Sequence, residues 1–389
     1  MRTFWTTIGA SALTLSLAFA CSANGSGVIE PATGGAAGAG AAGSTSGGGS
    51  AGITFDGGGA APNPDAACGY AVIPTTREPG TVLVVYDASC SMDECVDGNT
   101  TGCEQCTTGP SKWDQAKKGM TSVLNGLPND VRMGLVLFPD KTAGGNCAEP
   151  KSAVVGIDTL DKTRPSILGY VSAGTKGGTT PTEPALDLAY GILQQVPGPG
   201  RRGVLLVTDG AWNCGSGDAG IYKKAEDNWK THQISTFTVG LPGSADGSLS
   251  HLAHVGGADR VAGCNGQVPD PWNPFNDPSC NAKPDTCCHH VVGKNVQTDL
   301  VKSLKEIASK FLTNCVFQVP KGTDPKKFDP SFVNVSVDGV VVPQNGSDGW
   351  SYLPGGTDSL EIHGGLCAEI LAGTKKKVEI MLGCKTVVK

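Results

Sequence analysis

The residues best suited to chemistry are oxygen-bearing side chains grouped in three segments of the sequence. One segment holds a carboxylate and two hydroxyls at alternate positions, the second offers hydroxyls after a glycine pair, and the third is a single carboxylate. Carboxylate and hydroxyl oxygens are hard ligands that suit Mg²⁺ rather than Zn²⁺ or copper, and Mg²⁺ keeps several waters, so few protein ligands suffice. The segments are Asp87-Ala88-Ser89-Cys90-Ser91, Gly177-Gly178-Thr179-Thr180-Pro181-Thr182-Glu183-Pro184-Ala185-Leu186, and Asp209.

Alternating strands and helices must position these segments. The continuous apolar runs 81–86 and 203–209 predict strands buried on both faces, and each is followed by or ends on an acid. Such alternation favours an α/β fold with a doubly wound, mainly parallel sheet and helices on both faces, in which ligands bind at the carboxyl ends of strands. Further strands are expected over 130–138, 152–157 and 234–239, and helices over 113–127, 183–196, 219–230 and 297–312.

The motifs D-x-S-x-S, G-G-T-T-P-T-x-x-A-L and T-D-G, in this order, resemble the von Willebrand factor type A domain over about residues 78–315. In that family they form a metal-ion-dependent adhesion site. The resemblance implies that the serines coordinate the metal directly, that one or both Asp groups act through water, and that an open position accepts a partner's carboxylate. Carried over by position, the ligands are Asp87, Ser89, Ser91, Thr180 and Asp209, with Thr179 as the alternative to Thr180.

Two other interpretations of the same residues stay open. D-x-S-x-S is also the pattern of an Asx turn before a helix, with Thr180 capping the next helix. Trp212 and Asn213 flank the Asp209 end and form either a ligand rim or a simple loop anchor.

Fifteen cysteines indicate export, because cytosolic proteins rarely keep so many thiols. A positively charged start, the apolar stretch 6–19 and small residues before Cys21 predict a signal peptide over residues 1–20. Residues 17–21 resemble a bacterial lipobox, and lipidation of Cys21 leaves fourteen cysteines, enough for seven disulfides. Alternatively, residues 18–20 form an ordinary signal-peptidase site and the protein is secreted.

Residues 21–66 comprise the lipidated cysteine and a tether rich in Gly, Ala and Ser, with nothing to bury. In lipoproteins of Gram-negative bacteria, a Ser after the lipidated Cys, here Ser22, implies sorting to the outer membrane. We therefore expect an outer membrane lipoprotein that contacts the membrane through its lipid anchor.

Residues 67–315 are expected to form the von Willebrand-like domain, with Cys-rich insertions at 92–111 and 264–288 that shape, restrict or cover the metal site. Residues 316–389 predict a β-rich module stapled by disulfides, with a hairpin turn at Asp338-Gly339. Cys315 is expected to tie the preceding helix to this module or to the domain body.

Several cysteines and histidines have metal-like spacing. Cys103 and Cys106 are separated by two residues, but in an insertion we expect each to form a disulfide with a partner elsewhere. For Cys287-Cys288-His289-His290, two separate disulfides with solvated histidines are preferred over part of a zinc site. His251 and His254 are expected at the surface.

The composition excludes several functions. A net charge of −6 spread over 389 residues argues against a nucleic-acid-binding face, which needs clustered Lys and Arg. No Ser-His-Asp or Cys-His arrangement stands out, so we expect no enzyme. The favoured function is binding, through Mg²⁺ or Mn²⁺, of a protein or surface polymer that offers a carboxylate. The alternative is a structural envelope lipoprotein with an occluded or vestigial metal site.

Overall fold

A computed structural model describes most of the chain beyond residue 70, all of it within the unit Gly58–Lys389. The signal peptide, Cys21 and the tether lie outside the described residues, as do Cys68, Cys280 and Cys384. Among the described helices, none is long and apolar enough to cross a membrane. The described ranges are 71–75, 77–100, 103–140, 147–173, 177–198, 200–215, 217–264, 266–267, 284–309, 315–321, 328–371, 374–375, 377–383 and 386.

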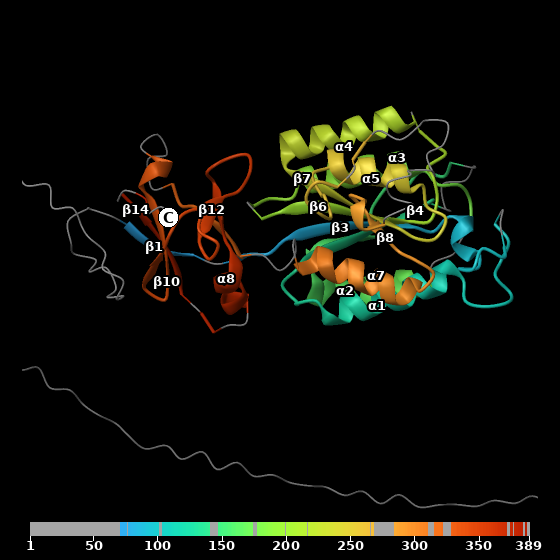
Figure 1. Ribbon diagram of the computed structural model, residues 1–389, viewed down its shortest axis with the longest axis horizontal. Helices are drawn as coiled ribbons and strands as arrows, with labels where there is room; N and C mark the ends of the chain where they lie inside the picture. The colour runs from blue at the N-terminus through green and yellow to red at the C-terminus, as the bar shows by residue number, and fades with distance from the viewer. Residues whose placement is uncertain are drawn as a thin grey trace, which may run out of the picture. The chain divides into compact units, whose positions relative to one another are not determined.

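A six-stranded sheet in the order β5-β4-β3-β6-β7-β8 forms the centre of the α/β part (Figure 1). The strands β4, β3, β6, β7 and β8 are parallel, and only the edge strand β5 runs antiparallel to its neighbour β4. The mainly parallel sheet expected from the sequence is therefore confirmed. The strands are β3 (Thr81–Asp87), β4 (Arg132–Phe138), β5 (Val155–Thr159), β6 (Arg202–Thr208), β7 (Ile234–Gly240) and β8 (His290–Val291).

Helices cover both faces of this sheet, as a doubly wound fold requires (Figure 1). The apolar residues of α1, α2 and α7 join one core cluster, and those of α3, α4 and α5 join the cluster on the other face. The expected helix 297–312 is α7, which ends as an α-helix at Ile307. The helices are α1 (Lys112–Gly126), α2 (Leu160–Ala173), α3 (Thr182–Gln194), α4 (Asp218–His232), α5 (Asp246–Val255) and α7 (Val296–Ile307).

Helices α2 and α5 have no counterpart among the expected elements. In α2, Pro165 lies inside the helix and interrupts the usual helix signal. In α5, the buried residues include Ser248, Ser250 and His251, so the buried face lacks the apolar periodicity that marks most helices.

The C-terminal part is built from two antiparallel sheets, β1-β14-β10-β11 and β12-β13-β9-β2. The expected hairpin joins β10 (Val333–Val337) to β11 (Val340–Val342), and both turn residues have positive φ, 49° at Asp338 and 82° at Gly339, as a type I′ turn requires. The other strands are β9 (Cys315–Gln318), β12 (Trp350–Tyr352), β13 (Ser359–Ile362) and β14 (Val378–Leu382).

Two short strands that precede β3 also belong to these sheets. β1 (Ala71–Thr75) pairs with β14, and β2 (Arg77–Glu78) pairs with β9. The expected boundary between residues 315 and 316 placed β1 and β2 in the von Willebrand-like domain. In the structure they belong instead to the sheets of the β-rich part. A helix, α8 (Gly364–Leu371), which the sequence did not indicate, joins the β-rich part.

Candidate metal centre

Asp87 ends β3, the central strand, and its carboxylate is fully buried. Oδ1 accepts a hydrogen bond of 2.8 Å from the backbone N–H of Ser89, and Oδ2 accepts one of 2.5 Å from the hydroxyl of Thr208. The first of these bonds is an Asx turn, so the local geometry that the structural interpretation requires is present. The second bond comes from the neighbouring strand β6 and fixes the carboxylate at the edge of the sheet.

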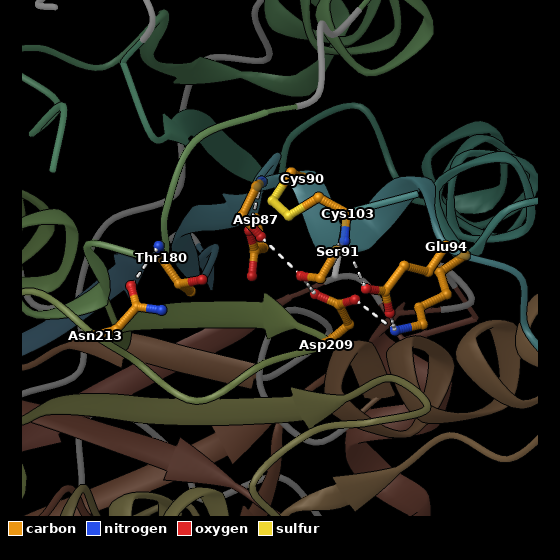
Figure 2. Close-up of a disulfide and its surroundings, with 10 residues drawn as sticks. Asp87, Cys90, Ser91, Glu94, Cys103, Thr180, Asp209 and Asn213 are labelled. Atoms are coloured by element: carbon orange, nitrogen blue, oxygen red, sulfur yellow. Dashed lines mark hydrogen bonds and ion pairs between the residues drawn. A yellow bond between two sulfur atoms is a disulfide. The ribbon is translucent and has the colours of Figure 1, made fainter. Parts of the chain in front are cut away.

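Asp209 follows β6 and lies beside the D-x-S-x-S loop, because the carboxyl ends of neighbouring parallel strands meet at one edge. The hydroxyl of Ser91 donates a hydrogen bond of 2.8 Å to Oδ1 of Asp209, and the hydroxyls of Ser89 and Ser91 are 3.1 Å apart. Figure 2 shows the side chains of Asp87, Ser91 and Asp209 converging from these two loops.

Thr180 completes the group from the loop before α3. A Cβ atom placed on Gly210 would lie 3.8 Å from Oγ1 of Thr180 and 3.9 Å from Oγ of Ser91, so both hydroxyls face the space beside this glycine. Thr179 points elsewhere, with its hydroxyl 3.3 Å from Sγ of Cys214. The structure thus favours Thr180 over Thr179 as the third hydroxyl of the group.

The five expected ligands form an oxygen-only set of two carboxylates and three hydroxyls. Asp87, Ser89, Thr180 and Asp209 are at most 5% exposed. This donor chemistry fits a small hard cation such as Mg²⁺ or Mn²⁺, because nitrogen and sulfur ligands are absent from the set.

Burial raises the pKa of both carboxyl groups. The pKa of Asp87 rises to about 7, through desolvation first and the negative charge of Asp209 second, while the hydrogen bond from Thr208 acts in the opposite direction. Desolvation also raises the pKa of Asp209, although the charge of Lys112 lowers it. Two carboxyl groups that are buried together favour a cation between them, since a cation would relieve both effects.

Lys112, the first residue of α1, enters the site and was not anticipated from the sequence. Its Nζ lies 2.8 Å from Oδ2 of Asp209 and 3.1 Å from Oε2 of Glu94. Burial by itself lowers the pKa of Lys112, but the charge and hydrogen bond of Asp209, followed by those of Glu94, raise it above its ordinary value. A lysine at a helix start carries no sequence signal for such a role.

Trp212 and Asn213 connect the loop after β6 to neighbouring segments of the chain. The amide oxygen of Asn213 accepts a hydrogen bond of 2.9 Å from the backbone N–H of Thr180 (Figure 2). The indole N–H of Trp212 donates a bond of 2.6 Å to Asp218, and its ring meets Tyr222 edge-on. These contacts fit the interpretation of both residues as loop anchors, and a role as ligand rim stays a prediction.

One disulfide closes the first Cys-rich insertion on itself, and a second joins it to the D-x-S-x-S loop. Cys103 bonds to Cys90, and Cys106 bonds to Cys95, so neither sulfur of the C-x-x-C pair bonds the other, as expected. Another disulfide, between Cys147 and Cys214, joins the loop that follows β4 to the loop that follows β6. Disulfides therefore fix two loops beside the carboxyl edge of the sheet.

The histidines that follow the second insertion differ from expectation. Cys288 bonds to Cys264, and Cys287 is also disulfide-bonded, but His289 and His290 are buried rather than solvated. His289 lies 3.3 Å from Asp246, at the start of α5, which accounts for its place inside the protein. His251 is also buried, while His254 is at the surface as expected.

A second group of candidate metal ligands lies beside this insertion. One ligand atom each of His254, Asp259, Cys264 and Cys288 falls within 4.8 Å of the others. Both sulfurs belong to one disulfide, and a disulfide offers no thiolate to a metal. The oxygen-only group therefore remains the better candidate.

Comparisons by sequence show which known proteins this chain is similar to. The von Willebrand factor type A domain model matches residues 82–267. An uncharacterized protein of Bacillus subtilis (strain 168), YwmC, is 26% identical over 188 residues, which is 47% of this chain and 76% of that protein.

Similar solved structures have low sequence identity. The PilB minor pilin from Streptococcus sanguinis has a TM-score of 0.40 and 14% identity, over 60% of this chain and 62% of that one. A von Willebrand factor type A protein from Catenulispora acidiphila has a TM-score of 0.36 and 14% identity, over 82% of this chain and 61% of that one. This chain thus spans less than two thirds of either structure's length. Residues 82–267 of this chain form a von Willebrand factor type A domain.

Proposed function

We propose that the von Willebrand factor type A domain binds one divalent cation, Mg²⁺ or Mn²⁺, and that the bound cation accepts a carboxylate from a protein or surface polymer. The function is interaction rather than catalysis. The residues that would hold the cation are Asp87, Ser89, Ser91, Thr180 and Asp209.

The observation that carries this proposal is the convergence of two loops far apart in the sequence. The Ser91 hydroxyl and the Asp209 carboxylate are bonded at 2.8 Å across 118 positions. An isolated Asx turn explains the bond from Ser89 to Asp87 but gives no reason for a second buried carboxylate to join it. A cation site gives that reason, because a bound cation neutralises both carboxylates.

Isothermal titration of Mg²⁺ and Mn²⁺ into the metal-stripped, oxidised full chain tests the proposal. We expect saturable binding at one site, lost in Asp209→Ala and kept in Asp227→Ala, which removes an exposed carboxylate from α4. Absence of binding in the folded wild-type chain contradicts the proposal. A partner found later must then dissociate when EDTA removes the cation.

A structural envelope protein with an occluded site is the second candidate. Burial supports it, because Asp87 is fully buried and Asp209 is 2% exposed. The same titration separates the two functions, since an occluded site takes up neither cation on the time scale of the experiment.

We also propose that the protein is exported and lipidated at Cys21, and that residues 22–66 hold the domain away from an outer membrane. Mass spectrometry of the N-terminal peptide tests this. A diacylglyceryl group on Cys21, absent in Cys21→Ala, is the expected result, whereas cleavage before Cys21 without a lipid indicates free secretion.

A further inference from the structure

Lys112 places a positive charge among residues that would otherwise present only negative charge and hydroxyls. Its side chain is 7% exposed, and its two carboxylate partners, Asp209 and Glu94, are 0% and 14% exposed. An ammonium is buried at this depth only when ion pairs offset its desolvation. The two carboxylates therefore fix its position beside the candidate cation site.

Glu94 reaches Lys112 from the Cys-rich insertion. Its Oε1 accepts a hydrogen bond of 3.1 Å from the backbone N–H of Cys103 (Figure 2). This leaves Oε2 to accept a bond of 3.1 Å from Nζ of Lys112. Its backbone carbonyl accepts a bond of 3.0 Å from the backbone N–H of Lys112. The disulfides of Cys90 with Cys103 and of Cys95 with Cys106 close the chain around it. The insertion thus holds the carboxylate of Glu94 against the ammonium of Lys112.

The charges of this group balance those of a divalent cation. A bound cation favours the ionised form of the carboxyl groups. In that state Asp87, Asp209 and Glu94 are negative and Lys112 is positive, so the group carries two net negative charges, which a divalent cation neutralises. Without the ammonium there are three negative charges, and without Glu94 there is one. Because charges this close interact strongly at low dielectric, either change alters the attraction for a cation.

We propose that Lys112 is a built-in counter-ion of the cation site, held in place by Glu94, and that this pair sets the affinity for the divalent cation. Lys112 weakens cation binding and Glu94 strengthens it. The neutral loaded site then accepts a carboxylate without repelling it. This inference rests on the proposed function, since it concerns the same site.

Isothermal titration of Mn²⁺ into the metal-stripped full chain tests the pair, with Glu94→Gln and Lys112→Met beside the wild type. We expect Lys112→Met to lower the dissociation constant about tenfold and Glu94→Gln to raise it about tenfold. Lys118→Met is the matched control, because it removes one exposed ammonium from the same helix, and we expect less than about a twofold change. Circular dichroism confirms that each variant is folded.

The outcomes separate the inference from the proposed function. An equal dissociation constant in Lys112→Met, Glu94→Gln and the wild type overturns the inference and leaves the cation site standing. Absence of binding in every folded variant overturns both. If Lys112→Met does not fold, Glu94→Gln decides alone, and unchanged or tighter binding in it contradicts the role of the pair.

Discussion

The hydroxyl of Ser91 donates a hydrogen bond of 2.8 Å to Oδ1 of Asp209, and Lys112 bonds the other oxygen of the same carboxylate at 2.8 Å. Both oxygens of a buried acid are therefore engaged, one by a neutral donor and one by a cation. The hydroxyl joins the D-x-S-x-S loop to the loop after β6, so each loop helps to fix the other at the site.

Replacement of Ser91 by Ala removes a candidate ligand and leaves Oδ1 of Asp209 without its donor. We expect the free energy of unfolding of the metal-free protein to fall by about 1–3 kcal/mol, because the lost bond ends on a buried acid. We also expect Mn²⁺ affinity to fall at least about tenfold. Urea unfolding and calorimetric titration measure the two effects.

Ser250→Ala is the control for this change. The Ser250 hydroxyl accepts a buried bond of 2.9 Å from the backbone N–H of Cys288, remote in sequence from the site residues. We expect Ser250→Ala to be less stable than the wild type and to bind Mn²⁺ with unchanged affinity. If both variants lose Mn²⁺ affinity to the same extent, the loss in Ser91→Ala results from general destabilisation and not from the removal of a ligand.

The raised pKa of Asp87 makes the metal-free protein less stable as the pH rises. An unfolded Asp ionises near about 3.9, whereas burial holds the folded pKa at about 7. Between these values the folded state binds more protons than the unfolded state, so each pH unit costs up to about 1.4 kcal/mol of stability. The loss begins near pH 4 and is complete slightly above pH 7.

Urea unfolding of the metal-free wild type and Asp87→Asn across pH 4 to 8 measures this effect. The stability difference between the two is expected to shift in favour of Asp87→Asn as the pH rises, because the amide does not titrate. A difference that is constant across this range contradicts a raised pKa at Asp87.

Much of the fold followed from local sequence pattern. Runs 81–86 and 203–209 were recognisable because strands buried on both faces are apolar without interruption. The expected ligands were named from the resemblance of three motifs to the von Willebrand factor type A domain, and two of these motifs stand where the runs end. The hairpin at Asp338-Gly339 was also predictable, since few residue pairs accept two positive φ angles.

Other features depend on contacts that local pattern does not encode. Ala71 pairs with Leu382 in β1 and β14, and no periodicity connects residues so far apart. Glu94 lies in a loop and Lys112 at the start of a helix, and charged residues are ordinary at both kinds of position. Neither residue therefore marks itself in the sequence as part of the site. His289 is buried because Asp246 meets it from α5, a helix that small polar residues conceal in the sequence.

Asn213 positions Thr180 through two hydrogen bonds. Its amide oxygen accepts from the backbone N–H of Thr180 at 2.9 Å, and its own backbone N–H donates to the Thr180 carbonyl at 3.3 Å. Asn213→Ala removes the first bond and lets the hydroxyl of Thr180 move. We expect Mn²⁺ affinity to fall about tenfold, as when a group that orients a metal ligand is removed.

Asn228→Ala is the control, because its amide bonds Gln194 on the exposed surface at 2.8 Å. Calorimetric titration should show that Asn228→Ala binds Mn²⁺ with the affinity of the wild type. If Asn213→Ala binds Mn²⁺ like the wild type while Thr180→Ala does not, Asn213 has no positioning role.

The disulfide between Cys315 and Cys367 joins β9 to α8 within the β-rich part and closes a segment with a sequence separation of 52. Opening it frees the unfolded chain, so replacing both cysteines by Ala should lower the free energy of unfolding of this part by up to about 4 kcal/mol. Hydrogen exchange with peptide resolution measures where the loss falls. Exchange should accelerate in β10, whose residues share the core cluster with Cys315, while β3 and the Mn²⁺ affinity stay unchanged. Faster exchange in β3 to the same extent would mean that the two parts unfold as one cooperative unit.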